Sequence, residues 1–258
     1  MTDTARRQIV AANWKMHGSL DMIQGYVGHL QPVEGVELVL FPPATHLAPL
    51  VSALDAVEAR VAVGAQDVHD KEAGAYTGEV AATMVADLGG RWAIVGHSER
   101  RRYAAESDEL VAAKVVAAFR AGLQPVLCVG ETLEERQAGD AEAVVARQLS
   151  CVTNALSAEA IRRLVVAYEP VWAIGTGHSA TLAQVETMHS AIRRVLNDAV
   201  DGEFAATVLY GGSVNEKNAI ELFSSSLVDG ALVGGAALAG ERFMTIARAM
   251  HEAGRAAG

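Results

Sequence analysis

Short apolar runs alternate with longer amphipathic stretches along the whole chain. The apolar runs are rich in β-branched residues and end in glycine, proline or polar residues, which is typical of parallel strands buried on both faces. Eight of these runs are predicted as strands, at residues 8–12, 37–41, 60–64, 92–95, 125–129, 164–167, 207–210 and 230–233.

Helical patterns lie between the predicted strands. Ser107 is placed to cap a helix that Gly122 can end, and Thr181 and Gln184 have capping-box spacing. Apolar residues at helical spacing form one face of each predicted helix: Val111, Val115, Ala118 and Phe119; Val145, Leu149, Val152 and Leu156; Val185, Met188, Ile192 and Val195.

Eight strand–helix units in one chain predict a single (β/α)8 barrel over residues 1–258, with eight parallel strands in a closed sheet and helices outside. The alternative is an open, doubly wound sheet. The two differ in where polar residues gather, because a barrel collects its site at the carboxyl ends of many strands. Here a set of such residues follows the strands: Asn13, Lys15, His97, Cys128, Glu169, Ser213, Gly234 and Gly235.

Composition excludes several classes of function. The net charge of −10 without a basic stripe argues against nucleic acid and against an anionic membrane surface, because the densest basic run is only Arg100–Arg102. Two cysteines suit a reducing compartment, and residues 1–8 lack the apolar core of a signal peptide. No apolar run reaches the roughly 18 residues that span a membrane, so we expect a cytoplasmic protein.

The segment 165–177 organises the rest of the chain. A buried strand ends in Glu169, Pro170 stops the strand, and the apolar residues 172–174 lead into a Gly-Thr-Gly sequence. This order predicts a base on a rigid strand end and a hydrophobic flap at 170–176. The alternative interpretation is a surface glutamate beside a buried loop.

Three other kinds of site are disfavoured. Residues 175–180 match the dinucleotide pattern G-x-G-x-x-A, but they do not directly follow their strand as that motif requires. Cysteine and histidine pairs with metal-ligand spacing are absent from the sequence, and so is a Gly-x-Ser-x-Gly elbow. We therefore expect neither a metal nor an organic cofactor.

Six segments together resemble the triosephosphate isomerase family, in order and over essentially the whole chain: 13–16, 96–101, 128–131, 168–177, 210–214 and 232–235. His17 and Ala237 depart from the family pattern without touching an assigned residue. The resemblance implies a cofactor-free aldose–ketose isomerase that interconverts D-glyceraldehyde 3-phosphate and dihydroxyacetone phosphate in glycolysis and gluconeogenesis.

Such a reaction needs a base for a C–H bond, an electrophile for the carbonyl group and an anchor for phosphate. The resemblance assigns the base to Glu169 and the electrophile to His97, as a neutral imidazole with a lowered pKa. Lys15 and Asn13 are expected to support the oxyanion, and Lys15 to supply the positive charge that holds the dianion. The expected phosphate contacts are Ser213, Gly234, Gly235 and, from the flap, Gly175.

Residues 65–79 form a long loop with apolar Ala75 and Tyr76 near its tip. In the family that it resembles, this loop inserts into a neighbouring subunit beside Asn13 and Lys15. We therefore expect a homodimer in which Thr77 reaches the partner's site; the alternative is a long flexible surface loop.

Two other functions stay open at this point. A relative acting on a four-carbon ketose phosphate, such as an erythrulose phosphate, would differ only in loop shape. A non-catalytic (β/α)8 binding protein is disfavoured because Lys15, His97 and Glu169 are all present.

Overall fold

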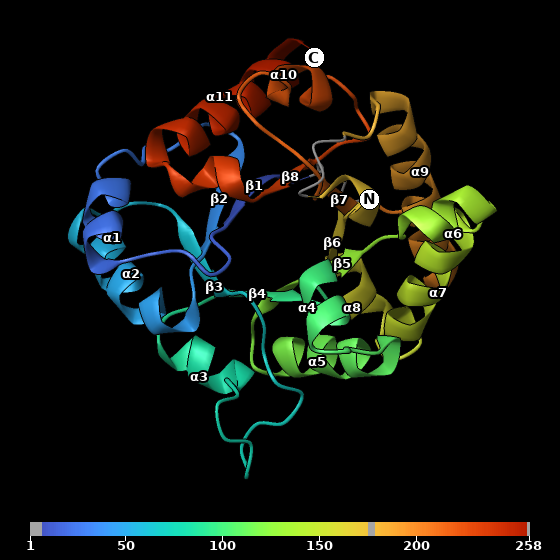
Figure 1. Cartoon of the computed structure of the whole chain (residues 1–258), viewed down its shortest axis with the longest axis horizontal. Coiled ribbons are helices and arrows are strands. Elements are labelled where there is room, and N and C mark those ends of the chain that lie inside the picture. The colour runs from blue at the N-terminus through green and yellow to red at the C-terminus, as the bar shows by residue number, and fades with distance from the viewer. Residues whose placement is uncertain (1–6, 175–178, 257–258) are drawn as a thin grey trace.

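A computed structural model describes residues 7–174 and 179–256 of the chain. Eight parallel strands close into a barrel in chain order, with β1 paired to both β2 and β8 (Figure 1). The closed barrel confirms the predicted fold class and is incompatible with the open-sheet alternative. The strands are β1 Gln8–Asn13, β2 Val36–Phe41, β3 Ala62–Ala65, β4 Trp92–Val95, β5 Gln124–Val129, β6 Val165–Tyr168, β7 Thr207–Tyr210 and β8 Gly230–Val233.

Helices form a ring around these strands (Figure 1). They are α1 Leu20–Val27, α2 Ala44–Ala56, α3 Ala82–Asp87, α4 Ser98–Tyr103, α5 Asp108–Arg120, α6 Leu133–Ala138, α7 Ala141–Thr153, α8 Ala158–Arg163, α9 Leu182–Ala199, α10 Ala219–Phe223 and α11 Gly240–Ala256. Two short 3-10 turns, η1 Val171–Ala173 and η2 Gly235–Leu238, follow β6 and β8.

Side chains alternate across the barrel wall, as they must in a strand. In β1, Ile9 and Ala11 belong to the apolar cluster inside the barrel, whereas Val10 and Ala12 pack outward against the helices. Both layers are almost fully buried, which explains why the strands read as continuous apolar runs.

Local signals set the predicted helix ends. The Ser107 hydroxyl accepts a hydrogen bond from the Leu110 N–H at the start of α5, and Thr181 and Gln184 form the predicted capping box of α9. Leu156 differs from the prediction because α7 ends before it, although its side chain still packs against the core.

Candidate active site

A cavity of about 800 Å³ opens at the carboxyl ends of the strands. The predicted site residues that line it come from five different strand ends: Asn13, Lys15, His97, Glu169, Ser213, Gly234 and Gly235. The predicted contact from Gly175 lies outside the described residues. The fold thus brings together residues that are up to 222 positions apart in the chain, between Asn13 and Gly235.

Glu169 directly follows β6, and each of its two carboxylate oxygens has a polar partner. Oε1 lies 2.9 Å from Nε2 of His97, and Oε2 accepts a hydrogen bond of 2.8 Å from the Ser98 N–H. Burial raises the pKa of Glu169, but His97 and the Ser98 N–H outweigh burial, so the pKa lies below its usual value. The side chain is only 2% exposed, and the neighbouring backbone leaves it little room: a Cβ at Gly211 would lie 2.9 Å from its Cγ.

His97 is the N-cap residue of α4, and its Nδ1 accepts a hydrogen bond of 3.2 Å from the Glu99 N–H. A nitrogen that accepts in this way carries no proton, so the ring proton belongs on Nε2, which faces Glu169. The helix start therefore fixes which nitrogen can donate to a carbonyl oxygen.

The expected lowering of the His97 pKa is wrong for this arrangement. Burial and the charge of Lys15 do lower the pKa, but the adjacent Glu169 carboxylate raises it more, and the net shift is upward. The sequence motif could not reveal this effect, because the effect depends on how the Glu169 side chain is turned.

Lys15 adopts a left-handed backbone conformation with φ of 51°, which is uncommon for a residue other than glycine. Its N–H donates to Oδ1 of Asn13 over 3.0 Å, and its carbonyl oxygen accepts from Nε2 of Gln66 over 2.8 Å. Its ammonium group lies 2.6 Å from Oε1 of Glu99. Asn13 and Gln66 thus fix the Lys15 backbone, and Glu99 orients its charge.

Sequence reasoning assigned no role to Ser98, Glu99 or Gln66. Ser98 and Glu99 lie inside the 96–101 motif, next to the residue that was assigned, so their position was the available signal. Gln66 gave no signal because its contact with Lys15 spans 51 positions and depends on the pairing of the barrel strands.

The flap begins at Pro170 and is joined to the loop after β5 through Glu131. The buried Oε1 of Glu131 accepts hydrogen bonds from Trp172 Nε1 over 2.8 Å and from the Tyr168 hydroxyl over 3.0 Å. The Val171 N–H donates to the Glu131 carbonyl oxygen over 3.1 Å. On the other side of the site, the Ser213 hydroxyl donates to the Ala173 carbonyl oxygen over 3.2 Å.

Three further observations concern ligands, metals and membranes. Gly234 and Gly235 stand at the start of η2 in the cavity wall, beside Lys15, where glycines allow a ligand close to the backbone. Among residues 7–174 and 179–256, no three His, Cys, Asp or Glu side chains are grouped as metal ligands. Within the same part of the chain, no helix is both long and apolar enough to cross a membrane.

Comparison with known proteins gives one consistent result. The family model described as triosephosphate isomerase matches residues 8–250. The chain is 51% identical over 249 residues to the triosephosphate isomerase of Stenotrophomonas maltophilia strain K279a, covering 95% of this chain and 98% of that protein. It is 50% identical over 250 residues to the enzyme of the same name from Xanthomonas campestris pv. campestris strain 8004, with the same coverage of both chains. The match over almost the full length confirms the resemblance seen in the motifs, and the chain belongs to the triosephosphate isomerase family.

Proposed function

We propose that this enzyme interconverts D-glyceraldehyde 3-phosphate and dihydroxyacetone phosphate through an enediolate. Family membership carries the reaction class, and the geometry supports the roles of individual residues. The main support for these roles is that Lys15, His97 and Glu169 all line the same cavity.

Glu169 is the base in this proposal. It leaves the Ser98 N–H, turns toward the substrate and takes a proton from C1 of dihydroxyacetone phosphate. The electrons of that C–H bond form the C1–C2 double bond, and the carbonyl electron pair moves to O2. The carboxyl group of Glu169 then delivers a proton to C2, which completes the aldehyde, so one carboxylate serves both carbons. Its proton can exchange with solvent before this return.

His97 is the electrophile. Its Nε2–H donates to O2 as negative charge develops there, and it later recovers a proton from O1–H. When Glu169 turns to the substrate, the main cause of the raised His97 pKa is removed, whereas burial and Lys15 continue to lower it. The neutral imidazole that the family resemblance implies is therefore favoured once Glu169 has turned to the substrate.

Substrate binding uses the remaining residues of the cavity. Lys15 supplies a fixed positive charge, and Asn13 holds the Lys15 backbone beside the developing oxyanion. Ser213, Gly234 and Gly235 offer backbone N–H groups to phosphate, and we expect Gly175 to add another from the flap. Closure of the flap (170–176) would exclude water from the enediolate.

Assembly as a homodimer is part of the proposal. Loop 65–79 projects from the barrel between β3 and α3 (Figure 1). Tyr76 near its tip is 45% exposed and its ring lies 4.3 Å from that of His69, while the His69 N–H is bonded to the Val80 carbonyl oxygen. These internal contacts favour a preformed shape that a partner's pocket could accept, with Thr77 at the partner's site.

Met16 directly follows Lys15 and is 95% exposed. Contact with a second subunit would remove this apolar side chain from water. We also propose that residues 1–258 form one domain and that the enzyme acts in the cytoplasm, where thiols such as the free Cys128 and Cys151 stay reduced.

The experiment that tests the function compares kcat/KM for three-carbon and four-carbon sugar phosphates in both directions. We expect a clear preference for the triose phosphates. A preference for a tetrulose phosphate would replace the substrate assignment and keep the mechanism, and absence of turnover for every sugar phosphate would favour a binding protein.

A further inference from the structure

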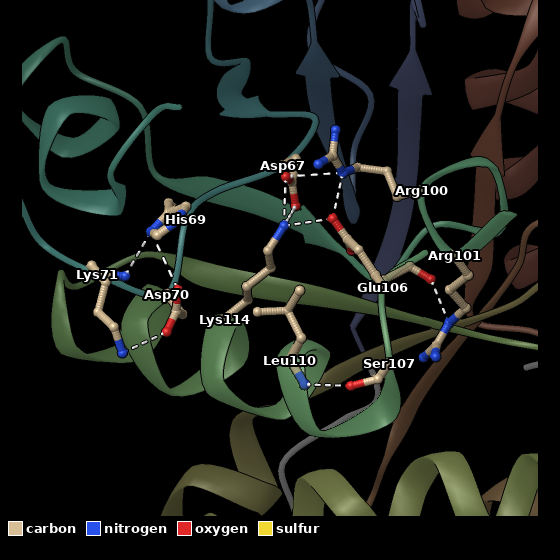
Figure 2. Close-up of polar contacts among 11 residues, drawn as sticks. Asp67, His69, Asp70, Lys71, Arg100, Arg101, Glu106, Ser107, Leu110 and Lys114 are labelled. Carbon is tan, nitrogen blue, oxygen red and sulfur yellow. Dashed lines mark hydrogen bonds and ion pairs between the residues drawn. The ribbon is translucent and has the colours of Figure 1, made fainter. Parts of the chain in front are cut away.

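Three consecutive arginines, Arg100–Arg102 on α4, differ in what they contact. Nε of Arg100 lies 2.6 Å from Oε1 of Glu106, and Nη1 of Arg101 lies 2.6 Å from Oδ1 of Asp108. Figure 2 shows the Arg100 guanidinium group beside the carboxylates of Asp67 and Glu106, which also contact Lys114. Two of the three charges are therefore neutralised by carboxylates.

Arg102 is the exception. It is exposed, its guanidinium carbon lies 5.2 Å from the centre of the Tyr103 ring, and no carboxylate within the described parts of the chain pairs with it. Arg102 and Glu99 are three positions apart on α4 and so share a face, and both line the active-site cavity with Lys15.

The lysine and arginine side chains that line this cavity are Lys15, Arg102 and Arg242. Lys15 is paired with Glu99 at 2.6 Å, and Arg242 is paired with Glu216 through two hydrogen bonds. Among these three, Arg102 alone carries a charge without a carboxylate partner in the described structure.

We propose that Arg102 is an encounter residue, which draws the phosphate dianion of the substrate to the mouth of the cavity and raises kcat/KM without taking part in the chemistry. This inference rests on the proposed function. The chain as a whole has a net charge of −10 and repels a dianion at long range. A cation without a carboxylate partner at the mouth of the cavity makes the local electrostatic potential attractive to the dianion, although the protein as a whole repels it.

A single exposed charge has a limited and predictable effect. In a water-like dielectric, a unit charge about 10 Å from a dianion changes the local concentration of that dianion roughly four-fold. Screening removes the effect as the Debye length falls from about 30 Å in 0.01 M salt to about 3 Å in 1 M salt. Salt dependence therefore separates attraction at a distance from direct contact.

The competing explanation is structural. Arg102 lies in the last turn of α4, where a cation interacts favourably with the helix dipole. Loss of that interaction would lower stability, and it would change activity by an amount that does not depend on the charge of the substrate.

Three variants distinguish these explanations: Arg102→Gln, Arg102→Lys and Arg60→Gln. Arg60 is exposed and precedes β3, at the end of the barrel away from the cavity, so its replacement changes the net charge equally. Steady-state kcat and KM for the triose phosphates are measured from 0.01 M to 1 M salt, with light scattering and thermal melting for each variant.

We expect Arg102→Gln to lower kcat/KM about three-fold at 0.01 M salt, where screening over about 10 Å is slight, with unchanged kcat, and to match the wild type at 1 M salt. Arg102→Lys should retain most of the wild-type value, and Arg60→Gln should differ little from it. A loss that persists at 1 M salt, an equal loss in Arg60→Gln, or a change in mass or melting that accounts for the loss would overturn the inference. Failure of the proposed function itself would appear separately, as a wild-type enzyme that does not turn over triose phosphates.

Discussion

Glu169 and His97 face each other in the site, with 2.9 Å between Oε1 and Nε2. The carboxylate oxygen of the proposed base thus lies where the proposed electrophile would hold the carbonyl oxygen of the substrate. In the proposed reaction, substrate binding separates the two side chains. The same contact moves both pKa values, downward for the carboxyl group and upward for the imidazole. Because the pair is almost fully buried, the substrate must supply the polar contacts that each partner loses.

Lys15 is expected to anchor phosphate. Replacing it with Met should weaken the binding of inorganic phosphate and raise the KM for triose phosphates about 10- to 100-fold, the usual range for a lost hydrogen bond to a charged group. Lys217→Met is the control, because Lys217 is exposed and lies in the neighbouring loop but does not line the described cavity. If the fold and the phosphate affinity of Lys15→Met are both normal, Lys15 is a surface residue with no part in binding.

The flap is expected to move when phosphate binds. Trp172 Nε1 donates a hydrogen bond to the Glu131 carboxylate, so a movement of the flap would break or rearrange that contact. In enzyme labelled with 5-fluorotryptophan, we expect inorganic phosphate to shift the ¹⁹F resonance of Trp172, which Trp172→Phe would assign, with exchange on the microsecond-to-millisecond timescale. Trp92 lies in β4 inside the barrel and should not respond. A Trp172 signal that is the same with and without phosphate would count against a mobile flap.

Dimerisation is expected to depend on loop 65–79. Shortening residues 73–78 should give a monomer with much reduced kcat, because Asn13 and Lys15 would lose the support of the partner's loop. Thr77→Arg should weaken the dimer by adding a charge at the contact, whereas Thr187→Arg, exposed on α9, should leave assembly unchanged. Light scattering checks the mass, and a fully active wild-type monomer of about 27.1 kDa would refute the dimer.

His189 should make the protein sensitive to acid. It is fully buried, its Nδ1 lies 2.8 Å from the Leu227 carbonyl oxygen, and burial lowers its pKa to about 3 from an ordinary 6.5. The unfolded chain therefore binds this proton more readily than the folded chain between pH 6.5 and 3. The contribution of neutral His189 to the free energy of unfolding is therefore fully present above pH 6.5 and is lost as the pH falls from 6.5 to 3.

The measurement is the free energy of unfolding in urea at pH 7 and pH 4.5. The two values differ by a His189 contribution of roughly 2–3 kcal/mol, since one pKa unit corresponds to about 1.4 kcal/mol. His189→Asn should reduce the difference between the two pH values by that amount, whatever its effect at pH 7. His29→Gln, at an exposed position, should leave the difference unchanged, and an undiminished difference in His189→Asn would show that other groups cause the acid sensitivity.

Much of the fold was predictable because the strands are apolar on both faces and punctuated at their ends. The exact ends of the strands were less predictable. Residues 60–64 were predicted for β3, but the strand is Ala62–Ala65. It begins at Ala62 because pairing with β2 begins there, opposite Val39. Pairing with a distant strand, which a single sequence does not display, sets where the strand begins.

The site shows the same division. Which residues reach the mouth follows from their places after the strands, so Asn13, Lys15, His97, Ser213 and Glu169 could be named from the sequence. Which side chains then bond to one another depends on rotamers and long-range contacts. The pairing of base with imidazole and the ion pair between Lys15 and Glu99 are of this kind, and only the structure displays them.

Proton transfer by Glu169 through an enediolate can be followed as exchange of carbon-bound hydrogen with solvent. The wild type and Glu169→Gln are each incubated with dihydroxyacetone phosphate in D₂O, and ¹H NMR follows the C1 protons of the ketose and the C2 proton of the aldehyde. We expect deuterium at both carbons with the wild type. With Glu169→Gln, exchange and turnover should be about 10²- to 10⁴-fold slower or more, and phosphate affinity should change little. Near-normal exchange and turnover in Glu169→Gln would show that Glu169 is not the base.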